Sequence, residues 1–300
     1  MSAARKGGRP ARRRRFGTVF GVDFSGARLA GRTTWVAKAV AQPRRRGESD
    51  PRLRLTELAS LERICGTAER GASMAALVRA IGQSRGALWA IDAPFGLPVE
   101  VRDAQTASWW QLLRFVRGWK QDGYDLGLWA LARADALGGP RHIFRATDRA
   151  ARAPFDAYHY RIIYQTYHAM RDVLWPLRRV QGTVILPFQY ARLASARRVV
   201  METCPGSTLK RLGLPHQNYK QPEGGPLTAR RKRTRREILA GLERHIEIPA
   251  QHRLRIARDP GGDALDAVIA AVGGSTSFAA TDHAAVGRDS RFRREGFLYF

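Results

Sequence analysis

The sequence has few residues that could cross-link the chain or hold zinc. Only two of its 300 residues are cysteines, Cys65 and Cys204, and they lie far apart. This excludes a disulfide framework and a cysteine-rich zinc motif, because both need several cysteines at short spacings. The seven histidines are dispersed and form no His-Glu-x-x-His pattern, which argues against a zinc hydrolase. We therefore expect a cytoplasmic protein in a reducing compartment.

Long apolar runs are also missing. No stretch of about 18 consecutive apolar residues is present, which is the length a helix needs to cross a bilayer. We therefore expect no membrane partner. Residues 1–15 are basic, but no apolar segment with a cleavage site follows them, as it would in a signal peptide. We interpret 1–15 as a disordered basic tail and expect a single domain over 16–300.

Acidic residues are half as numerous as basic ones, which leaves a formal net charge of +26. Such a charge favours polyanionic partners such as nucleic acid. The 46 arginines against 6 lysines are equally typical of proteins from GC-rich genomes with a solvated basic surface. The charge alone therefore does not decide between a nucleic-acid-binding surface and a compositional bias.

The densest internal basic cluster comprises Arg230, Arg231, Lys232 and Arg233. It opens a helix expected to run to about residue 246, where positive charge opposes the helix dipole. An anionic partner would relieve that repulsion, and a solvated basic loop is the alternative. We include these four residues, together with Ser25, Lys210 and Lys220, among the candidates for binding nucleic acid.

Three predicted strands share one design, an apolar run that ends on an acid. Residues 18–23 end at Asp23, residues 87–92 at Asp92, and residues 197–202 at Glu202. A carboxylate at the end of a buried strand is costly unless a cation or hydrogen-bond donor meets it. If the strands are parallel neighbours, these acids share the carboxyl edge of the sheet, where ligand chemistry in α/β folds gathers.

The other patterns place elements around these strands. Alternating residues predict strands at 33–40 and 52–58, and the apolar spacing at 74–81 predicts a helix. Tryptophan-rich segments predict a helical insertion over about 100–180, and Ser207 is the expected N-cap of a short helix at 208–212.

A last helix is expected at 261–272, with Leu265, Val268, Ile269 and Val272 as its buried stripe. Asp266 lies on the shoulder of that stripe and Asp263 farther round the helix. Either acid could instead serve only the helix dipole.

This order of elements and acids is similar to that of ribonuclease-H-like proteins. The chain resembles the family of predicted RNase H-like nucleases catalogued as domain of unknown function 429, over about 17–300. The matching segments are GVDFSGA (21–27), IDAPFGLP (91–98), PFDAYHYRIIYQTYHAMRDVLWPL (154–177), ETCPGSTLKRLGLP (202–215) and GGDALDAVIAA (261–271). The resemblance implies a ribonuclease-H-like α/β fold. Its mixed five-stranded sheet would be flanked by helices, with the insertion between the fourth and fifth strands.

Clustered carboxylates at such a site would bind Mg²⁺ or Mn²⁺, because the cations relieve the mutual repulsion of the acids. Two ions would stabilise the attacking water and the leaving oxygen of a phosphodiester. Asp23 would bridge the two ions, and Asp92 and Glu202 would flank it. Asp263 or Asp266 would bind the ion that holds the attacking water. The resemblance thus implies a nuclease that hydrolyses nucleic acid.

Two other functions fit the sequence less well. An actin- or sugar-kinase-like phosphotransferase shares the core and begins with a similar strand, but no second phosphate hairpin and no Walker-type Gly-x-x-x-x-Gly-Lys is found. A non-catalytic nucleic-acid-binding module could keep the fold without turnover. We expect no serine-hydrolase elbow of the Gly-x-Ser-x-Gly type.

Overall fold

A mixed sheet forms the centre of the protein in the computed structural model, which describes residues 16–43, 52–221 and 224–300. Within those ranges the sheet has eight strands: β1 (Thr18–Asp23), β2 (Trp35–Ala41), β3 (Leu53–Ser60), β4 (Ala87–Asp92), β5 (Thr183–Ile185), β6 (Arg198–Thr203), β7 (Ile246–Glu247) and β8 (Leu298–Tyr299). Their order is β5-β6-β4-β1-β2-β3-β7, and β8 pairs with β6. β1, β2 and β3 form antiparallel pairs, whereas β1, β4 and β6 run parallel.

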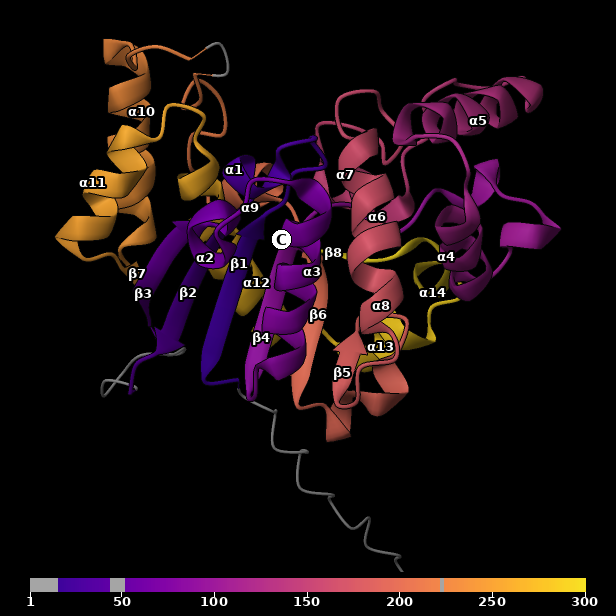
Figure 1. Cartoon of the computed structure of the whole chain (residues 1–300), viewed down its shortest axis with the longest axis horizontal. Helices are drawn as coiled ribbons and strands as arrows, with labels where there is room; N and C mark the ends of the chain where they lie inside the picture. The colour runs from indigo at the N-terminus through magenta and orange to yellow at the C-terminus, as the bar shows by residue number, and fades with distance from the viewer. Residues whose placement is uncertain (1–15, 44–51, 222–223) are drawn as a thin grey trace, which may run out of the picture.

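Helices cover both faces of the sheet, so the fold class is α/β (Figure 1). Because side chains alternate between the faces of a strand, β1 contributes to two hydrophobic cores. Val22 packs with Leu77 of α3 on one face, and Val19 packs with Val268 of α12 on the other. The helices outside the insertion are α1 (Ala30–Thr33), α2 (Leu61–Cys65), α3 (Arg70–Gln83), α9 (Pro205–Arg211), α10 (Ala229–Leu242), α11 (Ala250–Arg258), α12 (Asp263–Ala280), α13 (His283–Arg288) and α14 (Phe292–Glu295).

Small residues let α12 approach β1 unusually closely. A Cβ atom at Gly21 would lie 2.0 Å from the carbonyl oxygen of Ala267 and 2.3 Å from the backbone nitrogen of Ala271. No side chain fits at these distances, so glycine is required at this position. The contact holds the first turn of α12 beside the end of β1, and therefore brings the acids of both elements to one place.

The predicted insertion is present between β4 and β5. Its helices are α4 (Trp109–Gly118), α5 (Gly123–Ala136), α6 (Ala146–Ala151), α7 (Ile163–His168) and α8 (Trp175–Leu177), with a π-helical segment at Ala169–Leu174 between the last two. The apolar stripe that begins at Ile163 and ends at Leu177 is buried in the core shared with α3. The insertion therefore packs on the sheet as part of the same core.

Several expectations need correction. The sheet has eight strands in the described ranges, not five, because β5, β7 and β8 are only two or three residues long and carry no alternation signal. Ile246 begins β7 and does not continue the preceding helix. The helix after β6 begins at Pro205, so Cys204, not Ser207, occupies its N-cap position. Proline fits the first helical position because its nitrogen needs no partner there.

Three further expectations concern the N-terminal tail, the membrane and the cysteines. The basic tail at 1–15 lies outside the described residues. In the ranges that the structure does describe, none of the helices combines the length and apolar character needed to cross a bilayer. Both cysteines are free.

Candidate metal-binding site

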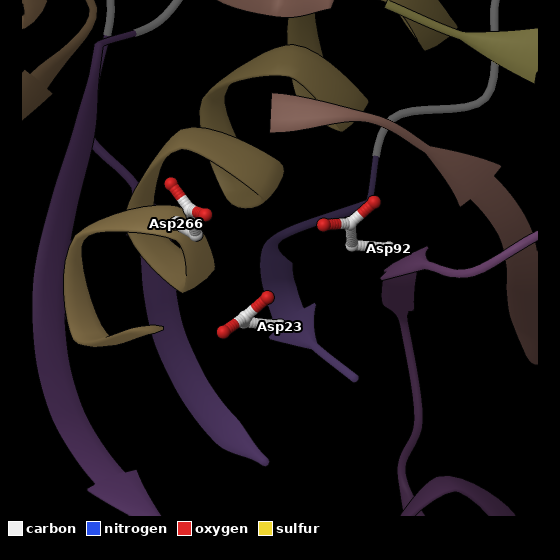
Figure 2. Close-up of side chains that lie close together, drawn as sticks. All are labelled: Asp23, Asp92 and Asp266. Atoms are coloured by element: carbon white, nitrogen blue, oxygen red, sulfur yellow. The ribbon is translucent and has the colours of Figure 1, made fainter. Parts of the chain in front are cut away.

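Two carboxylates meet at the carboxyl edge of the central strands. Asp23 is the last residue of β1 and Asp92 the last residue of β4, and the two are partners in the parallel register. Both strands are apolar up to these residues, so each acid stands at the boundary between the core and the loop that follows. The shared register places the two side chains next to each other, as Figure 2 shows.

A third carboxylate completes the cluster from the helix behind the sheet. Asp266 lies in the first turn of α12 and points toward the ends of β1 and β4 (Figure 2). One oxygen from each of Asp23, Asp92 and Asp266 lies within 4.8 Å of the others. We call these three residues the acidic cluster. Asp23 is 7% exposed and Asp266 is 2% exposed, so the cluster is largely withdrawn from water.

Two residues from the loop before α10 bind Asp266. The Tyr219 hydroxyl donates a hydrogen bond to Asp266 Oδ1 over 2.8 Å, and Lys220 Nζ forms an ion pair with Oδ2. Tyr219 was not among the residues singled out from the sequence, and a tyrosine in a polar loop gives no signal of this role. Lys220 is one of the candidate nucleic-acid contacts named from the sequence, and in the structure its charge lies against Asp266.

Burial dominates the electrostatics of the cluster. It raises the pKa of Asp23, against the effect of Lys220, and the neighbouring acids raise it further. Burial and the charge of Asp266 raise the pKa of Asp92 to about 8. Burial alone would lower the pKa of Lys220, but Asp266 and Asp23 outweigh it and raise that pKa well above its ordinary value. The lysine therefore stays charged, and Asp23 and Asp92 resist ionising together.

The donor set suits a divalent cation of the Mg²⁺ or Mn²⁺ type. Asp23 is buried and Asp92 is half-buried, and in the described ranges no hydrogen-bond donor contacts either carboxylate. Facing, unpartnered carboxylates are stabilised when a cation sits between them. The ligands are all oxygens, which hard divalent cations prefer.

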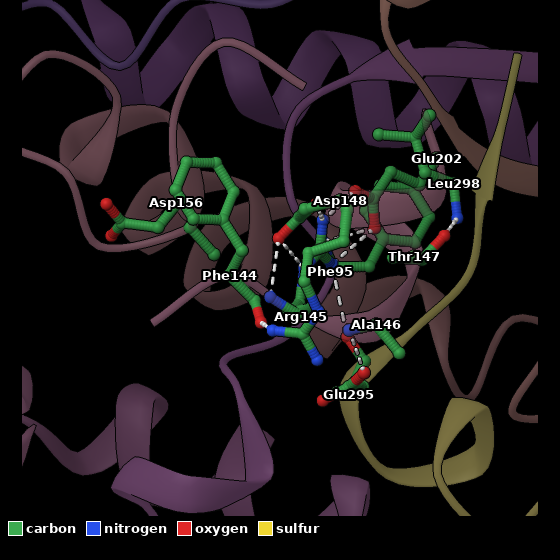
Figure 3. A network of polar contacts seen from close by, with 12 residues as sticks. Phe95, Phe144, Arg145, Ala146, Thr147, Asp148, Asp156, Glu202, Glu295 and Leu298 are labelled. Carbon is green, nitrogen blue, oxygen red and sulfur yellow. Dashed lines mark hydrogen bonds and ion pairs between the residues drawn. The ribbon is translucent and has the colours of Figure 1, made fainter. Parts of the chain in front are cut away.

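Glu202 has a different environment from the acidic cluster. Its carboxylate forms a buried ion pair with Arg145 and accepts a hydrogen bond from the backbone nitrogen of Phe95 over 2.9 Å (Figure 3). Arg145 also contacts Asp148 at 2.6 Å and the carbonyl oxygen of Glu295 at 3.1 Å. The structure therefore does not bring Glu202 into the cluster. Its oxygens are already used to anchor the insertion.

Asp263 lies near the cluster but is not one of the three acids. It begins α12, one turn before Asp266, and burial together with the charge of Asp259 raises its pKa to about 6. Gly262 is the N-cap residue of α12, and Asp259 Oδ2 accepts a hydrogen bond from the Ala264 backbone nitrogen over 2.8 Å. Of the two acids expected on this helix, Asp266 is the one that meets Asp23 and Asp92.

The other candidate nucleic-acid contacts are spread over the surface. The Ser25 hydroxyl accepts a hydrogen bond from the backbone nitrogen of Ala27, and Lys210 Nζ donates to the carbonyl of Arg152 over 2.6 Å. Arg230, Arg231, Lys232 and Arg233 lie in the first two turns of α10, which begins at Ala229.

A Gly-x-Ser-x-Gly pattern does occur, at 82–86, contrary to the expectation from the sequence. It joins the end of α3 to β4, whereas a nucleophile elbow joins a strand to a helix. The Ser84 hydroxyl donates to the carbonyl of Ile81 over 2.7 Å and accepts from the Trp89 indole over 3.0 Å. Ser84 therefore closes a turn, at the opposite end of β4 from Asp92.

The raised pKa of Asp92 predicts how stability depends on pH without divalent ions. The folded protein keeps a proton on Asp92 up to about pH 8, which the unfolded chain releases near pH 4. Stability from this carboxyl is therefore present below pH 4 and is lost as pH rises toward 8. We expect Asp92→Asn to flatten the fall in Tm between pH 5 and 8, measured by differential scanning fluorimetry in a chelator.

Glu57→Gln is the matched control for this measurement, because the Glu57 carboxylate is 65% exposed and pairs with Lys38 on the surface of the sheet. That variant should keep the wild-type slope. An Asp92→Asn protein with an unchanged slope would show that Asp92 ionises normally in the fold.

Comparisons with known proteins add no family to these observations: no family model, curated protein or solved structure matches the chain.

Proposed function

We propose that the protein is a metal-dependent nuclease with an RNase H-like fold, and that the acidic cluster binds its catalytic Mg²⁺ or Mn²⁺. The observation that carries the proposal is the convergence of Asp23, Asp92 and Asp266, with one oxygen of each within 4.8 Å of the others. These three acids, two of them buried, come from three separate elements, and within the described residues the ion pair at the cluster is that of Lys220 with Asp266. Such grouping is costly for folding and is typical of functional sites.

The fold supports the same proposal. Five of its strands have the order β3-β2-β1-β4-β6, with antiparallel pairing up to β1 and parallel pairing beyond it. Of the acids that the resemblance to RNase H-like nucleases implies, Asp23, Asp92 and Asp266 lie together, whereas Glu202 is paired with Arg145. The formal charge of +26 favours nucleic acid as the polyanionic substrate, and the two free thiols suit the cytoplasm.

Each residue has a separate task in this proposal. Asp23, Asp92 and Asp266 hold the metal, which when bound would supply an activated water and stabilise charge on the leaving oxygen. Tyr219 fixes the orientation of Asp266 through its hydrogen bond. Lys220 keeps a positive charge beside Asp266, where it attracts the phosphate of the substrate.

Cleavage of labelled single- and double-stranded DNA and RNA tests the proposal. The purified protein should cleave at least one of these substrates in Mg²⁺ or Mn²⁺ and none in a chelator. Asp92→Asn should lower the rate at least about 10-fold, since even the partners of metal ligands contribute 10- to 100-fold. Free metal at a concentration 100 times its Kd should also raise the free energy of unfolding by about 2.7 kcal/mol.

The matched control is again Glu57→Gln, which removes one exposed carboxylate from the same sheet and should cleave like the wild type. Metal-dependent cleavage that Asp92→Asn leaves unchanged would place the activity elsewhere. A protein that binds nucleic acid but cleaves none of the four substrates in either metal would instead be a non-catalytic binding module.

A further inference from the structure

An aromatic and cationic surface lies on the insertion just before and within α7. The rings of Phe155 and His159 stack with their centroids 4.4 Å apart, and those of His159 and Tyr160 lie 4.5 Å apart. The guanidinium of Arg161 lies 5.7 Å from the Phe155 ring centroid and 5.8 Å from that of Tyr160. We call Phe155, His159, Tyr160, Arg161 and Tyr164 the aromatic platform.

The platform exposes two of its rings to water while its backbone is anchored. The Tyr160 side chain is 63% exposed and that of Tyr164 is 36% exposed. Between and below them, the Tyr158 backbone nitrogen donates to Asp156, and the Thr166 hydroxyl donates to the carbonyl of Ala157. An exposed aromatic surface of this kind, held in place by buried neighbours, is typical of a binding site.

The platform adjoins the acidic cluster through the loop that follows Asp23. Gln165 Nε2 donates to the carbonyl of Phe24 over 2.6 Å, and Phe24 is the residue directly after Asp23. A Cβ atom at Gly26 would lie 2.2 Å from the carbonyl oxygen of Tyr164, so the loop is pressed against α7. The helix that carries part of the platform is therefore attached to the loop that leaves Asp23.

We infer that the aromatic platform binds the unpaired bases of a single-stranded nucleic acid and guides its backbone to the acidic cluster. This inference rests on the proposed nuclease function and names its substrate class. Aromatic side chains stack on any base whose face is free, and arginine adds charge toward the phosphates and stacks on the bases. Bases within a duplex stack on one another. Only the terminal bases of a duplex therefore have a free face that could stack on the platform.

Binding is measured apart from cleavage, in a chelator, by fluorescence anisotropy of labelled 12-nucleotide DNA and RNA strands and of the matching duplexes. The wild type should bind at least one single strand at least about fivefold more tightly than the matching duplex. Tyr160→Ala should weaken that binding at least about fivefold, because each base stacked on an aromatic ring contributes at least that much. Tyr160→Phe keeps the ring and should bind like the wild type.

Arg161→Ala provides a second variant, which removes the cation and keeps the tyrosine ring. It should weaken binding and reduce the slope of log K against log salt by about 0.7, the value for one phosphate contact on a single strand. Arg179→Ala is its control. Arg179 is also exposed but precedes the amino end of β5, at the edge of the sheet opposite the cluster.

The outcomes separate this inference from the proposed function. Equal affinity for duplex and single strand would contradict the proposed role of the platform, even if the protein cleaves nucleic acid. Unchanged binding by Tyr160→Ala and Arg161→Ala would contradict it as well. Binding of single strands that both variants weaken, without cleavage in Mg²⁺ or Mn²⁺, would support the platform and reject the nuclease.

Discussion

Asp23→Asn is expected to lower nuclease activity at least about 100-fold and, without divalent ions, to raise the Tm of the same protein. Asp23 ends the central strand and faces both Asp92 and Asp266 (Figure 2). An amide keeps the size of the side chain but not the charge that attracts a divalent cation. Because the partners of metal ligands already contribute 10- to 100-fold, loss of a ligand should reach or exceed the upper end of that range.

The gain in stability has a separate cause. Burial raises the pKa of Asp23, and the neighbouring acids add to the effect, so the ionised form is unfavourable in the folded state. A buried polar group without its partners costs about 1–3 kcal/mol, so a neutral amide in place of the carboxylate should stabilise the protein by about that amount. In a chain of this length that corresponds to roughly 2–5 °C in Tm.

Activity assays and scanning calorimetry in a chelator check both parts of the expectation. Glu57→Gln should leave both quantities at their wild-type values, because its carboxylate is exposed. If Asp23→Asn lost activity together with a lower Tm, the residue would be a structural support of the strand end and the metal assignment would lose its basis.

Arg145→Ala is expected to destabilise the fold by about 3–5 kcal/mol, the usual effect of breaking a buried ion pair by removing one partner. Arg145 is 1% exposed, and its guanidinium contacts Glu202, Asp148 and the carbonyl of Glu295 (Figure 3). The alanine variant leaves the two carboxylates buried without their cation. Urea unfolding followed by tryptophan fluorescence measures the loss.

Arg32→Ala is the control for this loss, since its ion pair with Glu62 is exposed and should contribute less than about 1 kcal/mol. The double variant Arg145→Ala with Glu202→Gln should be less destabilised than the sum of the single variants, because the two side chains interact directly. Additive losses would mean that Arg145 and Glu202 stabilise the protein independently. The ion pair would then not be the link between insertion and sheet.

The central strands and the cluster were largely predictable from the sequence. The apolar runs ending at Asp23 and Asp92 gave the bounds of β1 and β4, because a continuous apolar run and an abrupt acid leave little freedom in placing a buried strand. The helical spacing around Asp266 also placed that acid beside the buried face of α12. Local patterns thus sufficed where each element carries its own signal.

The same patterns could not assign Glu202. It ends an apolar strand as Asp23 does, but its partner Arg145 is 57 residues away, and no local pattern marks that pairing. The attachment of Tyr219 and Lys220 to Asp266 across more than 40 residues was missed for the same reason. What escaped prediction was therefore the choice of long-range partners, which decides whether a buried acid is structural or free for chemistry.

The contacts of Arg145 also affect the order in which parts of the protein fold during translation. Asp148 follows it after three residues, but the carbonyl of Glu295 follows only after 150. At roughly 5–20 residues per second, the ribosome needs about 8–30 s to produce that stretch. During this time the insertion can form its own helices, but it cannot yet be fastened to the far end of the chain. The nascent protein therefore completes the attachment of its insertion to the C-terminal segment last.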